Sequence, residues 1–165
     1  MPDLLTCDRH QIELSLAPIP LSAAAEFCHD DRYGAFASFV GWVRRVNVGR
    51  LVTGITYQSF QPLCRTVLTE ICQEAEQVFG QELRIYVQHR LGETRVGDPT
   101  VLIGVGAIHR DEACEACRFV IEELKHRAPI WKLEHYEDGD SGWVPGNCLC
   151  QERRSRDRRG STGPE

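Results

Sequence analysis

Two long segments with helical hydrophobic spacing constrain the fold of this 165-residue chain more than any other feature. Over residues 63–79, apolar side chains recur every three to four positions, and Gly80 follows as a stop signal. The same spacing returns over residues 111–127, with Asp111 as a candidate cap. Pro129 ends this second helix, because proline disfavours helical geometry at the residue before it and cannot donate a main-chain hydrogen bond.

Shorter segments with strand character surround these helices. Apolar alternation and β-branched or aromatic residues predict strands over residues 11–16, 33–43, 54–60, 83–90, 100–108 and 130–136. Residues 21–29 predict a short helix with Ser22 as its candidate cap, and the polar residues 44–53 predict a mobile loop. The resulting order β-α-β-β-α-β-β-α-β is typical of an α+β domain whose helices cover one side of a largely antiparallel sheet.

Length and charge limit the class of protein. The length fits one domain with a small appendage, so we assign residues 1–150 to the domain. Residues 151–165 are rich in arginine and lack an apolar pattern, which predicts a disordered tail. The net charge of −5 argues against nucleic acid as a partner. No run approaches the roughly 18 apolar residues that span a bilayer, and the N-terminus lacks a signal-peptide pattern, so we expect a cytoplasmic protein without a membrane partner.

Eight cysteines raise the question of a zinc site or a disulfide framework. Cys114 and Cys117 form a C-x-x-C pair inside a helical segment, and Cys148 and Cys150 form a C-x-C pair near the C-terminus. Together these four could hold zinc in an interaction module, which stays an alternative. We favour cysteines that serve as small hydrophobic residues in a reducing cytosol, and we expect no metal.

The chain contains only two lysines, Lys125 and Lys132, among 19 lysine and arginine side chains. Arginine keeps its proton at any working pH, whereas a lysine in a desolvated or cationic pocket can lose its proton and act as acid, base or nucleophile. The turn at Pro129 can bring both ammonium groups into one pocket. Two solvated surface amines are the simpler alternative.

Two further clusters place cations at the ends of predicted strands. The apolar strand that ends near Trp42 and Val43 runs into Arg44, whose charge could point into a cleft, although a surface arginine pair is the alternative. His109 and Arg110 precede a helix N-terminus, where free N–H groups and the positive dipole end suit an anion such as phosphate. Arg110 could instead pair with a neighbouring carboxylate.

The length of the second helix bears on how these clusters combine. Arg110 and Lys125 are fifteen residues apart, which at about 1.5 Å per residue corresponds to roughly 22 Å. Both helix ends cannot line one small pocket, so we hypothesise a homodimer in which His109 and Arg110 of one subunit face the lysines of the other. A further polar segment, residues 88–93, is interpreted as structural or interfacial rather than catalytic.

Taken together, these motifs resemble the large, catalytic subunit of molybdopterin synthase, with a likeness that runs from about residue 12 to residue 143. The most specific block is Leu124-Lys125-x-x-x-Pro129-Ile130-Trp131-Lys132-x-Glu134. The other matching motifs are Phe39-x-Gly41-x-Val43-Arg44, His89-Arg90-Leu91-Gly92, His109-Arg110 and Trp143.

The resemblance implies an α/β hammerhead-type fold and a heterotetramer, in which two large subunits form a homodimer and each binds a small ubiquitin-like sulfur-carrier subunit. The carrier's C-terminal Gly-Gly thiocarboxylate would enter the large subunit's pocket. Two sulfurs would then pass to cyclic pyranopterin monophosphate to make molybdopterin. The resemblance implies no metal or organic cofactor.

The same resemblance assigns roles to individual residues. Lys125 and Lys132 would act as general acid or base and stabilise charge. The substrate's phosphate and pterin would contact Arg44, His109 and Arg110, and the pocket would be lined or supported by Trp42, Val43, Leu133 and Glu134. Two departures from the family pattern are Gln58, where relatives commonly carry Glu, and the lack of a basic residue soon after Trp143. A non-catalytic pterin- or partner-binding protein of the same fold therefore stays an alternative.

Overall fold

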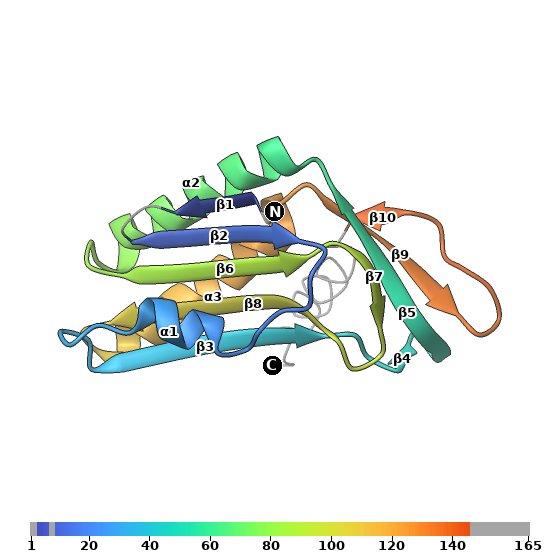
Figure 1. Ribbon diagram of the computed structural model, residues 1–165, viewed down its shortest axis with the longest axis horizontal. Helices are drawn as coiled ribbons and strands as arrows, with labels where there is room; N and C mark the ends of the chain where they lie inside the picture. Colours follow the sequence, from blue (N-terminus) through green and yellow to red (C-terminus); the bar gives the residue numbers. More distant parts are fainter. Residues whose placement is uncertain (1–2, 7–8, 146–165) are drawn as a thin grey trace, which may run out of the picture.

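The computed structural model describes residues 3–6 and 9–145 and contains two sheets and three helices in this part of the chain (Figure 1). The first sheet has the strand order β1-β2-β6-β8-β3. Its strands are β1 (Asp3–Thr6), β2 (His10–Ser15), β6 (Arg84–Arg90), β8 (Pro99–Ala107) and β3 (Ala35–Trp42). Only β2 and β6 pair in parallel here, so the sheet is largely antiparallel, as the sequence predicts.

The second sheet is built around the long strand β5 and lies beside one end of the first sheet (Figure 1). Its order is β10-β9-β5-β4, and β7 pairs with β5. Its strands are β4 (Val46–Asn47), β5 (Arg50–Ser59), β7 (Gly92–Arg95), β9 (Ile130–Tyr136) and β10 (Val144–Pro145). This sheet is antiparallel throughout its described pairings.

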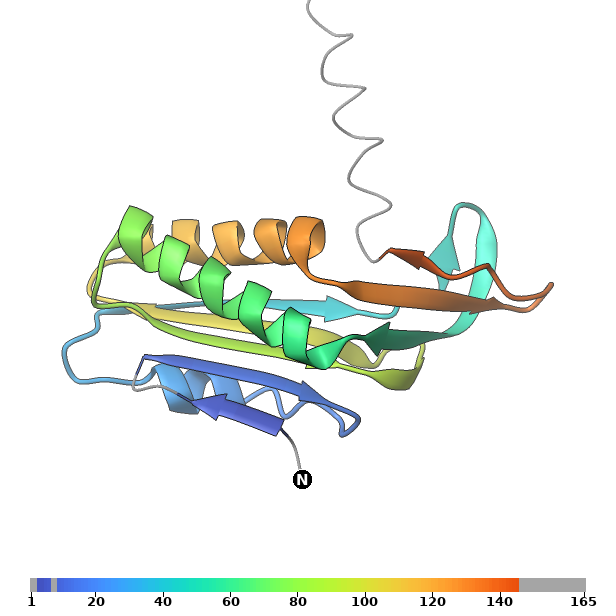
Figure 2. The same cartoon turned by 90° about the horizontal axis from the view of Figure 1, so that it is seen from above.

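The three helices cover both faces of the first sheet, as the view from above shows (Figure 2). Helices α2 (Gln61–Phe79) and α3 (Arg110–Arg127) pack on one face and form the main core with β6 and β8. The short helix α1 (Ala23–Cys28) packs on the opposite face against Tyr86 and Leu102. The α+β class is confirmed, but the prediction that helices cover only one side is wrong. The reason is that the residues of β6 and β8 are buried on both faces of the sheet, so each face needs cover.

Glycine and proline predict where the long helices end more reliably than side-chain caps predict where helices begin. Helix α2 ends before Gly80, whose φ of 133° suits glycine. Helix α3 ends before Pro129, with Ala128 already extended. Ser22 stands at the N-cap position of α1 as predicted, but it has helical dihedral angles and its side chain makes no capping bond. The predicted cap of α3 is wrong, because His109 and not Asp111 occupies that position.

The predicted mobile loop over residues 44–53 is largely a hairpin made by β4 and the start of β5. The turn between the strands is formed by Val48 and Gly49, which have φ values of 48° and 76°. Two consecutive residues with positive φ make the tight turn that suits a hairpin. Strands β1, β4, β7 and β10 escape prediction because they are short and lack apolar alternation.

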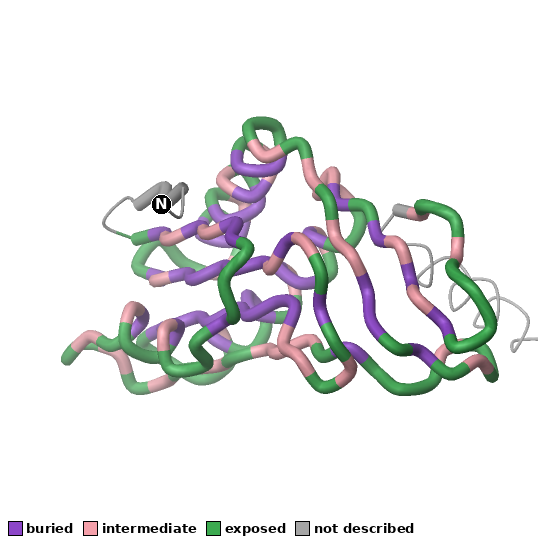
Figure 3. The backbone as a smooth tube through the Cα atoms, turned by 45° about the vertical axis from the view of Figure 1, so that its right-hand side comes forward, coloured by how far each residue is buried: buried purple, intermediate pink, exposed green. Residues whose placement is uncertain are grey.

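Burial is concentrated in the first sheet and in the two long helices above it (Figure 3). The second sheet has a small core of its own, formed by Val43, Val52, Ile55 and Tyr136. None of the described helices is long and apolar enough to cross a membrane. The predicted tail, residues 151–165, lies outside the described residues.

Candidate active site

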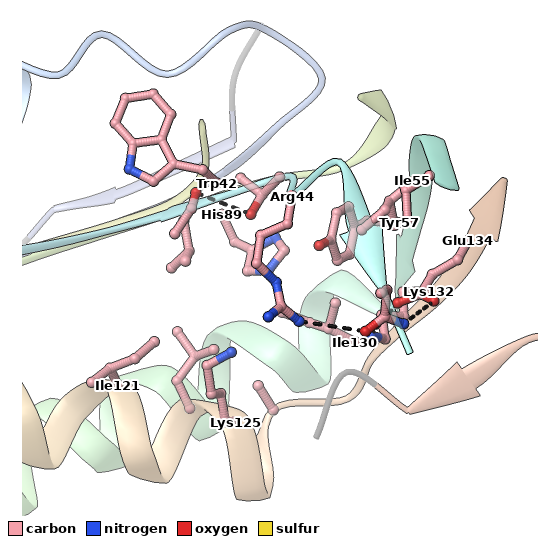
Figure 4. Close-up of a pocket in the computed structure, with 17 residues that line it drawn as sticks. Trp42, Arg44, Ile55, Tyr57, His89, Ile121, Lys125, Ile130, Lys132 and Glu134 are labelled. Atoms are coloured by element: carbon pink, nitrogen blue, oxygen red, sulfur yellow. Dashed lines mark hydrogen bonds and ion pairs between the residues drawn. The ribbon is translucent and has the colours of Figure 1, made fainter. Parts of the chain in front are cut away.

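A cleft lies where α3 and the end of the first sheet meet the second sheet (Figure 4). Its walls come from six strands, from α3 and from the connections beside them. The lining residues are Gly41, Trp42, Arg44, Asn47, Val52, Ile55, Tyr57, His89, Thr100, Val101, Ile121, Leu124, Lys125, Ala128, Ile130, Lys132 and Glu134.

The turn after α3 brings both lysines into this cleft. Lys125 lies in the last turn of α3, the chain extends at Ala128, and β9 starts at Ile130. Along β9 alternate residues face the same side, so Lys132 and Glu134 both point into the cleft. Lys132 is only 8 % exposed, which makes it a buried amine and not a surface one. The alternative of two solvated surface lysines is therefore wrong for Lys132.

Glu134 holds Lys132 and is itself held by two more donors. The Lys132 Nζ donates to Glu134 Oε1 at 2.6 Å. The other carboxylate oxygen, Oε2, accepts from Asn47 Nδ2 at 2.8 Å and from the hydroxyl of Tyr136. Burial alone would raise the pKa of Glu134, but the hydrogen bonds from Lys132, Tyr136 and Asn47 outweigh it and lower the pKa below its ordinary value. Glu134 is thus a carboxylate at neutral pH and compensates the charge of Lys132.

His89 closes the inner wall of the cleft and is neutral at working pH. Its Nδ1 lies 2.8 Å from the carbonyl oxygen of Arg90, which can only accept, so the neutral ring carries its proton on Nδ1 and leaves Nε2 as an acceptor. Burial, with a smaller effect of the nearby positive charge of Lys125, lowers the pKa of His89 to about 4, against the opposing effect of the Arg90 hydrogen bond. The imidazole also packs edge-on against Tyr57, with ring centroids 5.0 Å apart.

Arg44 and Trp42 reach the cleft because β3 is irregular at its end. The register between β3 and β8 shifts between Gly41 and Trp42, and such a bulge redirects the chain that follows. A Cβ on Gly41 would lie 2.6 Å from the Val101 side chain, so glycine allows this close approach. Trp42 is 51 % exposed and forms part of the rim, whereas Arg44 extends into the cleft toward Asn47 (Figure 4).

The other predicted site residues lie elsewhere. Val43 is buried in the core of the second sheet, and Leu133 alternates away from the cleft on β9. His109 and Arg110 lie at the opposite end of α3 from Lys125. Arg110 is almost fully exposed, with its Nε 3.6 Å from the carboxylate of Asp111. Within one subunit, therefore, the structure separates this pair from the lysines, as the helix length predicts.

Comparisons with known proteins show which family the chain belongs to. The model of the MoaE protein family matches residues 14–127 of the chain. The molybdopterin synthase catalytic subunit of Synechococcus elongatus is 99% identical over 165 residues, the full length of both chains.

The chain belongs to the MoaE family.

Solved structures show that the MoaE fold extends over most of the described chain. Molybdopterin synthase from Staphylococcus aureus superposes with a TM-score of 0.75 at 30% identity, covering 79% of this chain and 94% of that chain. A complex of subunits 1 and 2 of molybdopterin-converting factor from Helicobacter pylori contains a chain with the same fold, at a TM-score of 0.67 and 24% identity. This match covers 78% of the present chain and 87% of that chain.

Neither Gln58 nor the described candidate zinc ligands, Cys114 and Cys117, line the cleft of this MoaE chain. Gln58, the departure from the family pattern, is an exposed residue of β5 that alternates with the cleft residue Tyr57. Of the four candidate zinc ligands, Cys148 and Cys150 lie outside the described residues. Cys117 is buried, and burial raises the pKa of its thiol to about 11, so it lacks the thiolate that zinc needs. In the described part of the chain no three metal-binding side chains cluster.

The cleft residues that the sequence does not predict as site residues include Asn47, Tyr57 and His89. The sequence predicts a loop at Asn47 and a structural or interfacial role for His89. Burial raises the pKa of Tyr57, so its hydroxyl stays protonated in the cleft. A weak signal was available for His89, since a polar residue that ends an otherwise apolar strand often faces a site.

Proposed function

We propose that the cleft transfers sulfur from the C-terminal thiocarboxylate of a small carrier subunit to cyclic pyranopterin monophosphate, with Lys125 and Lys132 as the catalytic residues. The role of the protein in molybdopterin synthesis follows from its family membership and from its 99% identity to a molybdopterin synthase catalytic subunit. What supports this use of the cleft is one observation: the chain's only two lysines both line it.

The two lysines have different surroundings, which suits different tasks. Lys132 is buried and paired with the Glu134 carboxylate at 2.6 Å, so a proton can pass between Nζ and a fixed acceptor. Lys125 is in the last turn of α3, where the helix dipole favours its charge, and it faces the same space as Arg44. In this proposal Lys125 and Arg44 stabilise negative charge on the substrate and on the thiocarboxylate, and Lys132 handles the proton.

A homodimer completes the proposed site. His109 and Arg110 lie at the N-terminus of α3, which suits an anion, but one subunit alone cannot bring them to its own lysines. We therefore propose that they contact the substrate bound in the neighbouring subunit's cleft. Val43 and Leu133 support the walls from behind, and Trp42 borders the entrance.

The partner is proposed to be a small ubiquitin-like subunit that ends in Gly-Gly. The two-subunit complex of molybdopterin-converting factor from Helicobacter pylori supports a second, different subunit for this fold. The thiocarboxylate, the heterotetramer and the absence of a cofactor remain parts of the proposal. A cytoplasmic location, and the division into a domain over residues 1–150 and a tail, remain predictions.

The test is reconstitution of molybdopterin formation from the purified chain, a thiocarboxylated small subunit and cyclic pyranopterin monophosphate. Lys132→Met and Lys125→Met should each lower kcat by at least about a hundredfold, since each removes a group that acts on the reacting atoms. Arg118→Met, an exposed cation on α3, is the matched control and should keep the wild-type rate. Wild-type turnover in both lysine variants would refute the proposed roles.

A further inference from the structure

A single amide side chain connects the β4–β5 hairpin to the Lys132–Glu134 pair of β9. Asn47 donates from Nδ2 to Glu134 Oε2 at 2.8 Å and to the Tyr136 hydroxyl at 3.0 Å. Its Oδ1 accepts from Arg44 Nη2 at 3.4 Å. The hydroxyl of Tyr136 in turn donates to the same carboxylate oxygen of Glu134. Asn47 therefore joins the one arginine of the cleft wall to the carboxylate that holds Lys132.

The hairpin holds this amide in place with an unusual backbone. Val48, the residue after Asn47, has a φ of 48°, a left-handed conformation that a β-branched side chain rarely adopts. Its side chain is 81 % exposed, so packing does not explain the choice of residue or conformation. Strain of this kind persists where the surrounding structure enforces it, and such positions often accompany functional sites. Here the turn directs the amide of Asn47 inward, against Glu134.

We propose that Asn47 is a positioning residue for the Lys132–Glu134 pair, and that the β4–β5 hairpin acts on the cleft through this one amide. The hydrogen bond from Nδ2–H stabilises part of the negative charge on the Glu134 carboxylate. The carboxylate therefore attracts the proton of Lys132 less strongly. When the hairpin moves and the amide withdraws, Glu134 binds the lysine proton more firmly. The effect on turnover rests on the proposed function, whereas the effect on the pair does not.

Other groups also act on Lys132 and must be held constant in a test. Glu134 and Tyr136 face this pair from its own strand, Arg44 from the connection between β3 and β4, Tyr57 from β5, His89 from β6 and Lys125 from α3. Substitutions confined to residue 47 leave all of these groups in the protein. The comparison between variants at this position then isolates the amide.

The first measurement is the titration of the lysines by NMR in protein labelled with ¹³C at lysine Cε. The chain has only two lysines, so two signals are expected, and Lys132→Met assigns them. In Asn47→Ala the midpoint of the Lys132 signal should move to higher pH, because its carboxylate partner has lost a donor. The Lys125 signal should move less. Unchanged titration of Lys132 would overturn the inference.

The second measurement is the pH profile of turnover in Asn47→Asp. A carboxyl at this position can donate to Glu134 only while it is protonated. The like charge of Glu134 raises the pH at which it loses its proton, and Arg44, at 3.4 Å from this side chain in the wild type, opposes that effect. Turnover should approach the wild-type rate at the acidic end of the profile and fall toward that of Asn47→Ala at the alkaline end. Asn47→Ala should be slower at every pH, on the order of ten- to hundredfold.

Val46→Asp is the matched control, because it adds the same carboxyl one residue away from Asn47, on a side chain that is half exposed. It should show the wild-type profile. If the Lys132 signal moves in Asn47→Ala without a loss of turnover, Asn47 positions the pair but the catalytic role of Lys132 fails. If turnover falls while the Lys132 titration stays unchanged, Asn47 acts by another route and the inference is overturned.

Discussion

Replacing His89 by asparagine should make the protein markedly less sensitive to acid. Asparagine can still donate to the Arg90 carbonyl from near the Nδ1 position, but it cannot bind a proton. Between pH 7 and pH 5 the wild-type free energy of unfolding should fall by about 2 kcal/mol more than that of His89→Asn. The variant's own stability at pH 7 does not enter this comparison.

The magnitude follows from the burial of the imidazole. In an unfolded chain histidine titrates near pH 6.5, whereas in the folded protein burial lowers the pKa of His89 to about 4. Between these values the unfolded chain binds a proton that the folded one does not, so stability is lost as the pH falls below 6.5 and the loss ends near pH 4. The full shift corresponds to roughly 3 kcal/mol, of which about 2 kcal/mol falls between pH 7 and pH 5.

The assay is urea unfolding followed by tryptophan fluorescence, at one protein concentration and at both pH values. His29→Asn, at an exposed histidine just after α1, is the control and should lose stability as the wild type does. His10 is also buried and contributes its own acid sensitivity, but it is present in every variant and cancels. Equal acid sensitivity in His89→Asn and the wild type would refute the assignment of His89 as a buried neutral ring.

Two further substitutions test the backbone. Val48→Asn should raise the stability by about 1 kcal/mol, seen as a higher Tm, because asparagine tolerates the left-handed φ that valine does not; no gain would mean that the turn is unstrained. Gly54→Ala should lower the stability by about 1–3 kcal/mol in urea unfolding, because its Cβ would lie 2.4 Å from the Thr94 carbonyl oxygen, whereas Gly142→Ala has open space and should have little effect. Equal effects at both glycines would contradict the described contact between β5 and β7.

Local pattern was enough to predict the long elements of the fold. Helices α2 and α3 start within two residues of the predicted positions, because their apolar stripes and their stop signals at Gly80 and Pro129 are local features. The apolar run of β8 was predicted for the same reason. The sequence does not predict the placement of α1. The face of the sheet that a helix covers depends on the burial of strands distant in the sequence, such as β6.

In the candidate site, too, the residues of a local motif are predicted and those that depend on distant pairings are not. Lys125, Lys132 and Glu134 belong to one continuous motif around a proline turn, and the structure places all three in the cleft. Asn47 and His89 reach it only through pairings that residues near them in the sequence do not encode. β5 aligns with β9 so that Tyr57 lies opposite Lys132, and β6 lies between β2 and β8. Asn47 and His89 are distant in the sequence from the lysine motif, so the motif alone does not predict them as site residues.

The turn at Ala128–Pro129 makes the candidate site sensitive to chain length at one point. Residues alternate between the two sides of β9, so Lys132 and Glu134 face the cleft while Trp131 and Leu133 face away. One residue inserted or removed between α3 and β9, with the pairing to β5 kept in place, would exchange these sets. An indole and a leucine would then replace the amine and the carboxylate. Relatives that keep this chemistry should therefore keep the length of this turn.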